Sequence, residues 1–242
     1  MQLSLRLSVI ADMVTTGNRL VDVGCDHGYL PVYLVLNKKI PSAIAMDVRK
    51  GPLSRAEEHI EQYQLCEYIE TRLSDGLAAL KPGEGDTLVI AGMGGPLMER
   101  ILSDGAAVLN SFRELILQPQ SDVGHFRHFI RENGWDIVEE AFIVEDGKFY
   151  TIIKAVSKAQ EEILPYTKEE ELFGKILLET KNAVLKQYLQ RELRIKEEIL
   201  ERLAGASKDA AKQRMTEVEE EKQYIKTALK YYENNGTDSL AE

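Results

Sequence analysis

The segment that follows Arg19 constrains the fold of this chain more than any other. A short apolar run at 20–23 stops at Gly24, a second glycine follows at Gly28, and residues that favour a helix continue from Tyr29 to Leu36. This order predicts a strand, a tight turn and the start of a helix. Glycine has no side chain and tolerates positive φ, so such a turn lets bare backbone approach a ligand. The sequence therefore predicts a ligand site where this first strand ends.

The spacing of residues in this turn separates it from a dinucleotide-binding motif. It is not the Gly-x-Gly-x-x-Gly of NAD-binding folds. It is similar to the (Asp/Glu)-x-Gly-x-Gly-x-Gly signature of class I S-adenosylmethionine-dependent methyltransferases. Asp22, Gly24 and Gly28 occupy the expected positions, and Asp26 replaces the middle glycine.

Strand-like and helix-like segments alternate through the first two thirds of the chain. Such alternation implies an α/β fold with a parallel sheet and helices on both faces. An Asp-Gly turn at 146–147 predicts a terminal hairpin, the antiparallel edge seen in methyltransferases of this class, whose last strand lies beside the fifth. We therefore expect a Rossmann-like, seven-stranded class I methyltransferase domain. The predicted strands are 20–23, 42–47, 68–72, 87–91, 115–118, 135–144 and 149–156.

The chain changes character near Pro165, the last of its seven prolines. Long stretches rich in Glu, Lys and Leu follow, and these favour helix. We predict one helix over 172–203, ended by Gly205-Ala206-Ser207, and a second over 211–232, with Ser207 or Asp209 as its N-cap. The second helix carries mainly apolar residues at heptad spacing, interrupted by Lys222, so the two helices predict a coiled-coil hairpin. The expected domains are 1–158, catalytic, and 166–235, helical.

Composition limits the partners and the compartment. The formal net charge is −10, so a nucleic acid must be met on a confined basic face. No apolar run approaches the ~20 residues of a membrane span. Cys25 and Cys66 have neither disulfide-framework nor zinc-ligand spacing, which indicates reduced thiols and no metal. We expect a cytoplasmic protein without a membrane partner that is a monomer, or a dimer if the helical tail associates.

Three further strand ends fit a sulfonium cofactor, although each has a plainer interpretation. The strand ending in Asp47 and Val48 would place a carboxylate on ribose hydroxyls, or Asp47 would cap the next helix. Asp75-Gly76 would meet the adenine amine, or form only a turn. The apolar strand that opens into the loop Gly92-Met93-Gly94-Gly95 would admit a substrate, or be a tight connection. The ordered occurrence of all these motifs favours the cofactor.

The chain resembles the bacterial tRNA (adenine-22-N1)-methyltransferase family, often called TrmK. The resemblance spans essentially the whole chain and is carried by Leu3-Ser4-Leu5-Arg6-Leu7, Asp22 to Pro31, Val89 to Gly95, and Leu115-Ile116-Leu117-Gln118-Pro119-Gln120. It implies a Rossmann-like catalytic domain, a helical domain that helps to hold tRNA, and methyl transfer from S-adenosylmethionine to N1 of an adenine. Enzymes that methylate exocyclic adenine amines generally carry (Asp/Asn)-Pro-Pro-(Phe/Tyr) where this chain has Gly92-Met93-Gly94-Gly95, which fits a ring nitrogen better.

Asp26 is the leading catalytic candidate, because its carboxylate should project from the turn towards the reaction centre. It would orient the adenine amine or accept its proton; alternatively, it would satisfy turn amides or the cofactor's ammonium group. The expected cofactor-binding residues are Asp22, Gly24, Asp26, His27, Gly28, Asp47, Val48, Asp75, Gly76 and Gly92. The expected substrate-binding residues are Arg6, Tyr29, Met93, Gly94 and Gly95.

Two rival functions follow from the same residues. A methyltransferase of this fold could act on a protein or a small molecule, because fold does not fix substrate. A non-catalytic RNA-binding scaffold could retain the fold with a decayed cofactor site. The intact Asp22, Gly24, Gly28 and Asp47 argue against decay.

Overall fold

A computed structural model describes residues 1–158, 165–204 and 209–233, and the chain divides into two compact units, Met1–Ile163 and Leu164–Glu242. Each unit has its own helices and its own buried side chains. No helix in the described ranges is long and apolar enough to cross a membrane.

The first unit is built on a seven-stranded sheet with the order β3-β2-β1-β4-β5-β7-β6. Neighbours among β1 to β5 are parallel, and β7 lies antiparallel between β5 and β6. The predicted seven-stranded methyltransferase sheet, with its last strand beside the fifth, is therefore confirmed. The strands are β1 (Leu20–Val23), β2 (Ala43–Asp47), β3 (Ile69–Leu73), β4 (Thr87–Met93), β5 (Glu114–Pro119), β6 (Trp135–Glu145) and β7 (Lys148–Ser157).

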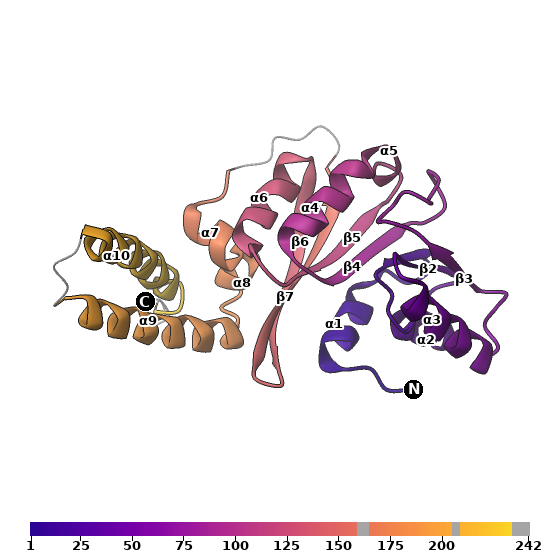
Figure 1. Ribbon diagram of the computed structural model, residues 1–242, viewed down its shortest axis with the longest axis horizontal. Coiled ribbons are helices and arrows are strands. Elements are labelled where there is room, and N and C mark those ends of the chain that lie inside the picture. Colours follow the sequence, from indigo (N-terminus) through magenta and orange to yellow (C-terminus); the bar gives the residue numbers. More distant parts are fainter. Residues whose placement is uncertain (159–164, 205–208, 234–242) are drawn as a thin grey trace, which may run out of the picture. The chain divides into compact units, whose positions relative to one another are not determined.

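Helices cover both faces of this sheet (Figure 1). They are α1 (Leu5–Met13), α2 (Tyr29–Leu36), α3 (Lys50–Gln62), α4 (Gly95–Asp104), α5 (Ala106–Leu109) and α6 (Val123–Glu132). Buried residues of α1, α2 and α3, such as Ile10, Leu34 and Ile60, form one apolar cluster with Val89 and Ile116 of the central strands. On the opposite face α4 packs against α6. Burial on both faces explains why the central strands are almost wholly apolar.

The hairpin that closes the sheet turns where the sequence predicts it. Asp146 and Gly147 have φ values of 49° and 73°, and both lie between β6 and β7. Positive φ at both central residues is the requirement of a tight type I′ turn, which Asp-Gly satisfies at little cost. The turn places Glu145 beside the first residues of α1, where its carboxylate accepts a hydrogen bond from the Leu5 amide (2.5 Å).

The second unit contains more helices than the sequence analysis predicts. In place of one helix over 172–203 there are α7 (Lys168–Phe173), α8 (Lys175–Glu179) and α9 (Ala183–Leu203). The prediction was wrong because two residues leave helical geometry, Gly174 at φ 90° and Lys181 at φ 53°. Asn182 then begins α9 by accepting a hydrogen bond from the Leu185 amide (2.9 Å).

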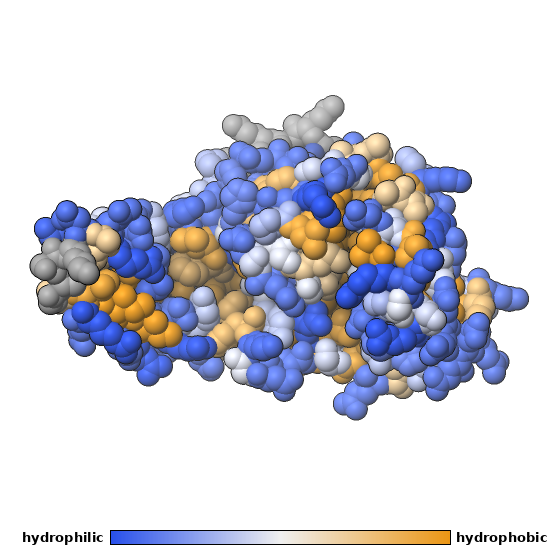
Figure 2. All heavy atoms as spheres, viewed as in Figure 1, coloured by the Kyte–Doolittle hydropathy of each residue, from blue (hydrophilic) through white to orange (hydrophobic). Residues whose placement is uncertain are grey.

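The last helix, α10 (Asp209–Lys230), packs against α9. Its buried residues are Val218, Ile225 and Ala228, and those of α9 are Leu185 and Leu189. An apolar strip runs along the pair on the face drawn in Figure 2. The coiled-coil character of this pair stays a prediction, and the expected helix end at 205–207, with the alternative cap at Ser207, lies outside the described residues.

Candidate active site

A cavity of about 650 Å³ opens at the carboxyl ends of β1 to β4. This is the edge at which ligands bind in open α/β sheets. Among the residues singled out from the sequence, the structure brings eleven into the lining: Arg6, Asp22, Gly24, Asp26, Tyr29, Asp47, Val48, Asp75, Gly76, Gly92 and Met93. His27, Gly28, Gly94 and Gly95 are not among the lining residues.

The turn after β1 forms one wall of the cavity. Gly24, Asp26 and Gly28 all have positive φ, at 77°, 49° and 67°. The amides of Gly24 and Cys25 both donate to the Met46 carbonyl oxygen, at 2.8 and 3.0 Å, which ties the turn to the end of β2. Asp26 therefore holds a conformation that non-glycine residues seldom adopt, and the surrounding turn stabilises it there.

Glycines outside the lining serve the packing of the elements that form it. A Cβ atom on Gly28 would lie 3.1 Å from the Ala56 Cβ atom, so Gly28 allows α2 to begin close to α3. A Cβ atom on Gly95 would lie 2.6 Å from the Ser121 carbonyl oxygen, so Gly95 allows the loop after β4 to approach the loop after β5.

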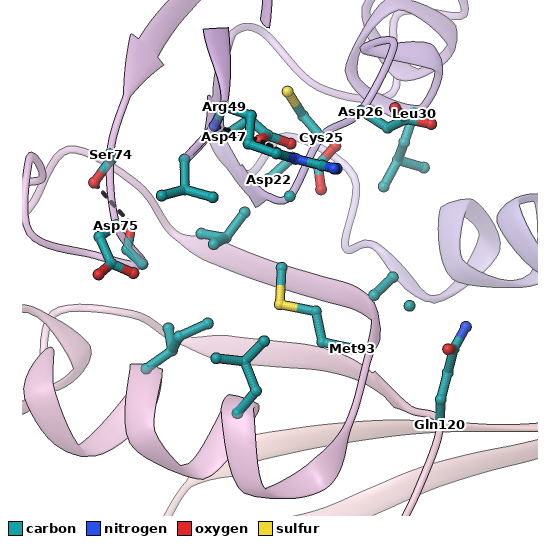
Figure 3. Close-up of a pocket in the computed structure, with 18 of the residues that line it drawn as sticks. Asp22, Cys25, Asp26, Leu30, Asp47, Arg49, Ser74, Asp75, Met93 and Gln120 are labelled. Carbon is teal, nitrogen blue, oxygen red and sulfur yellow. Dashed lines mark hydrogen bonds and ion pairs between the residues drawn. The ribbon is translucent and has the colours of Figure 1, made fainter. Parts of the chain in front are cut away.

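Two buried carboxylates lie near each other in the cavity lining, Asp22 from β1 and Asp47 from β2 (Figure 3). Burial, followed by the charge of Asp47, raises the pKa of Asp22 to about 7. Burial also raises the pKa of the neighbouring Cys25 thiol, which stays protonated. Asp47 accepts a hydrogen bond from the Arg49 amide (2.8 Å). A ligand with a positive charge or with several hydroxyl groups would pair with the carboxylates of Asp22 and Asp47.

One end of the cavity is marked by Asp75. The buried Ser74 hydroxyl donates to the Gly76 carbonyl oxygen (2.9 Å) and accepts from the Ala79 amide (3.1 Å). These bonds fix the turn after β3 that presents Asp75. The Asp75 carboxylate is exposed and lies 3.6 Å from the Arg100 guanidinium of α4.

The opposite end is organised by a bulge in β4. The register of β4 against β5 shifts between Ala91 and Met93, and Gly92 has φ 79°. The Gly92 amide donates to the side-chain oxygen of Gln118 (3.0 Å), which also accepts from Nη1 of Arg6 (2.9 Å). Gln118 is only 1% exposed, so it joins the bulge to α1 from within the protein. Gln120 lies beyond Met93 at this end, far from Asp75 in Figure 3.

Asp26 and two aromatic rings lie along the rim. The Asp26 side chain is 65% exposed, and its carboxylate lies 3.7 Å from Nε2 of His27. The rings of His27 and Tyr29 are stacked with centroids 5.4 Å apart, and His59 of α3 meets the edge of Tyr29 at 4.7 Å. His27 thus packs on Tyr29, a lining residue, and does not itself line the cavity.

Several lining residues were not assigned to the site from the sequence: Arg49, Ser74, Arg100 and Gln120. The buried Gln118, which holds Gly92 and Arg6 from behind the lining, was not assigned either. Gln118 and Gln120 lie in a segment that resembles the family, yet nothing in their spacing shows that β5 ends beside β4 and α1. Across residues 1–158, 165–204 and 209–233, no three His, Cys, Asp or Glu side chains are placed to hold a metal ion.

Comparison with known proteins identifies the family. Residues 20–229 match the family model described as TrmK: tRNA (adenine(22)-N(1))-methyltransferase. The chain is 33% identical over 234 residues to the tRNA (adenine(22)-N(1))-methyltransferase of Bacillus subtilis, covering 95% of this chain and 98% of that protein.

Solved structures agree with this match. A Streptococcus pneumoniae protein solved in complex with S-adenosyl-L-methionine is 34% identical, with a TM-score of 0.84 over 94% of this chain and 100% of its own. The TrmK of M. capricolum, solved with S-adenosyl-homocysteine, is 25% identical, with a TM-score of 0.82 over 96% of this chain and 99% of its own. The chain described here belongs to the tRNA (adenine(22)-N(1))-methyltransferase family.

Proposed function

We propose that the cavity at the carboxyl ends of β1 to β4 binds S-adenosylmethionine and that the chain methylates N1 of adenine 22 in tRNA. One observation gives the main support for this cavity as the cofactor site. Three carboxylates line the cavity from three neighbouring strands: Asp22 lies in β1, Asp47 ends β2 and Asp75 comes two residues after β3. Membership of the family supports the reaction, and the position of these three carboxylates supports this cavity as its site.

The donors and acceptors of the cavity fit this cofactor. Asp47 is placed to accept from ribose hydroxyls, and Asp75 from the exocyclic amine of the cofactor's adenine. Asp22 lies where a cationic group would relieve its repulsion with Asp47. Gly92 leaves the backbone open to close approach, because a Cβ atom on it would meet nothing nearer than 3.7 Å, and Val48 supplies apolar contact. A Cβ atom on Gly24 would lie 2.4 Å from the Met93 methyl group and one on Gly76 3.1 Å from Ile101, so these two glycines make room for neighbouring side chains.

When bound, S-adenosylmethionine supplies a sulfonium methyl group; a C–N bond to adenine N1 forms as the C–S bond breaks, and the electron pair stays on sulfur. Adenine N1 carries an in-plane lone pair, so no proton must leave before attack. The chain's task is therefore to hold the base in line and to stabilise the positive charge that develops on it.

We assign to Asp26 the stabilisation of the positive charge that develops on the adenine. Its exposed carboxylate projects from a constrained turn at the cavity, and no hydrogen bond from the described residues occupies it. It would orient the adenine amine and stabilise the cationic product. Arg6, Tyr29 and Met93, with the loop at Gly94 and Gly95, would receive the extruded base.

tRNA is the partner this assignment requires, and tRNA is found in the cytoplasm. We expect the chain to act as a monomer, with dimerisation through α9 and α10 as the alternative. Binding must rely on basic residues gathered locally, because the chain carries 30 Lys and Arg against 40 Asp and Glu.

Transfer of labelled methyl from S-adenosylmethionine to unmodified tRNA tests the proposal. The nucleosides are separated after nuclease digestion, and label should appear in 1-methyladenosine from position 22 alone. A tRNA with guanine at position 22 is the control. Label in another nucleoside would contradict the acceptor assignment, and label only in protein or small molecules would contradict the substrate class.

Asp26→Ala tests the catalytic assignment. We expect the variant to fold and to bind S-adenosylmethionine, because the side chain is exposed and lies apart from Asp47 and Asp75. Its kcat should fall by about 100-fold, the usual scale for removing one transition-state stabilising group. Asp26→Asn keeps the shape and loses the charge, and is the matched control. Near-full activity in Asp26→Ala would remove Asp26 from catalysis.

A further inference from the structure

The end of the cavity around Gly92 contains the side-chain amide of Gln120, which has no role in the mechanism above. Gln120 lines the cavity and is exposed, and its side chain has no hydrogen-bond partner in the described part of the chain. Its backbone is fixed, because its amide donates to the Met93 carbonyl oxygen (2.8 Å). The backbone is therefore held at a constant place beside the cavity, and both polar atoms of the side chain are available to a ligand.

Two side-chain ends converge over Gly92. A Cβ atom built on Gly92 would lie 3.7 Å from Nη1 of Arg6 and 3.8 Å from Nε2 of Gln120. Arg6 is held there by Gln118 and by the ring of Tyr150, whose centroid lies 5.5 Å from the guanidinium carbon. The Gln120 side chain makes no such contacts within the described residues. The Arg6 guanidinium is thus bound by neighbouring side chains, whereas the Gln120 amide is available to a ligand.

The chemistry of a glutamine amide suits one edge of adenine. Glutamine can accept from the N6 amine through Oε1 and donate to N7 through Nε2, a bidentate pair specific for adenine. This pair occupies the Hoogsteen edge and leaves N1 unobstructed on the Watson–Crick side. Guanine presents O6 in place of the amine, which would face the Gln120 oxygen and be repelled.

We propose that Gln120 is the specificity-determining residue of the acceptor site, reading N6 and N7 of the adenine, and that Gln118 and Arg6 are positioning residues that hold this corner together. This rests on the proposed function and names the contact that selects the base. Gln118 acts by satisfying the Gly92 amide and the Arg6 guanidinium with one buried oxygen.

The test pairs protein variants with single-atom changes in the base. tRNAs carrying adenine or 7-deazaadenine at position 22 are assembled by ligation, since 7-deazaadenine keeps N1 and N6 but lacks the N7 acceptor. For the unaltered protein we expect kcat/KM to fall about threefold to tenfold on 7-deazaadenine, the value of one hydrogen bond. For Gln120→Ala we expect a fall of about 10- to 100-fold on adenine, with no further penalty on 7-deazaadenine.

The variant Gln120→Glu should reverse the preference between adenine and 7-deazaadenine, which a merely structural role of Gln120 could not do. A carboxylate still accepts from N6 but repels the N7 lone pair, so this variant should methylate 7-deazaadenine faster than adenine. Gln62→Ala, an exposed glutamine of α3 outside the cavity, should retain the discrimination of the unaltered protein. Cofactor affinity by calorimetry should be unchanged in all variants.

Two results would overturn the inference while leaving the proposed function intact. One is an equal 7-deazaadenine penalty in the unaltered protein and in Gln120→Ala. The other is adenine methylation by the unaltered protein with no penalty on 7-deazaadenine. Absence of any methylation of position 22 by the unaltered protein would instead contradict the proposed function.

Discussion

Asp22 is held in an environment that favours its neutral form. It is 5% exposed and lies beside Asp47, and its pKa is raised to about 7. The folded protein therefore retains a proton that the unfolded chain releases near the ordinary aspartate pKa of 3.8. The free energy of unfolding therefore decreases as the pH rises from about 4 to about 7, because the unfolded chain loses this proton first. Above pH 7 the folded protein carries the full cost of a buried, charged Asp22. Such a cost at a ligand site is removed when a cation binds.

We expect Asp22→Asn to stabilise the cofactor-free protein at pH 8, where asparagine replaces a buried charge, and to change little at pH 5. The melting temperature should rise by about 2–4 °C for each kcal/mol of relief. Cofactor affinity should rise with pH through about 7 in the unaltered protein and be flat in the variant. Calorimetry at both pH values measures both effects, and an equal loss of stability at pH 5 and pH 8 would contradict this account.

Helix α1 is fixed at both ends, which places Arg6 over the cavity. At its start, Ser4 and Glu145 accept hydrogen bonds from the Leu7 and Leu5 amides. At its end, Lys39 donates to the Ala11 carbonyl oxygen (2.7 Å) and Lys154 to that of Met13 (2.7 Å). Cations at the C-terminus of a helix also interact favourably with its dipole.

Lys154 further pairs with the buried Glu114 (3.0 Å). Burial raises the pKa of Glu114, but hydrogen bonds from Thr15, Thr87 and Lys154 outweigh it and the pKa is lowered. Glu114 therefore contributes stability that is present above its unfolded pKa of 4.5 and is lost as the pH falls through the lower folded value.

Lys154→Met should leave Glu114 buried without a cation. We expect a loss of about 3–5 kcal/mol in the free energy of unfolding, and acid unfolding at a higher pH because the Glu114 pKa rises. Urea denaturation at pH 7 and pH 5 measures both. Lys148→Met, at the exposed hairpin turn of β7, is the matched control and should be nearly neutral. An equal effect of the two substitutions would show that α1 does not depend on this pair.

The whole chain combines a cofactor-binding unit with a helical unit whose core is separate. Leu185 and Leu189 of α9, with Val218 and Ile225 of α10, are buried within the second unit. The chain's net charge of −10 opposes tRNA, so affinity must come from local groups of basic residues and must weaken steeply with salt.

A chain ending at Lys158 should retain cofactor affinity within about twofold, since a domain with its own core folds alone. We expect its tRNA affinity to fall at least about tenfold, with a shallower salt dependence, as phosphate contacts are lost. Calorimetry and filter binding at several salt concentrations distinguish the two effects. Unchanged tRNA affinity would show that the helical unit serves another purpose.

Local patterns in the sequence were sufficient to predict the class of fold and several residues of the cavity. The strand–glycine–helix pattern at 20–36, the Asp-Gly turn at 146–147 and the apolar strands predict a seven-stranded sheet, because periodicity and turn chemistry act over a few residues. The place of the last strand beside the fifth was expected from the similarity to class I methyltransferases, and the order of the other strands comes from the structure. The carboxylates at strand ends were predictable for the same reason, since parallel strands end at one edge. The single long helix at 172–203 was mispredicted, because Lys181 adopts positive φ without any local signal.

What only the tertiary structure decided is where distant residues meet. Gln118 joins Arg6 and Gly92, which lie far apart in the chain, and Gln120 reaches the cavity only because β5 pairs with a bulged β4. The raised pKa of Asp22 likewise depends on burial beside Asp47. Propensity and spacing report the neighbourhood along the chain, whereas hydrogen-bond partners, desolvation and charge pairing depend on distances through space. The sequence by itself therefore determined the class of fold and the family, and the tertiary structure decided which residues meet at the Gly92 end of the cavity.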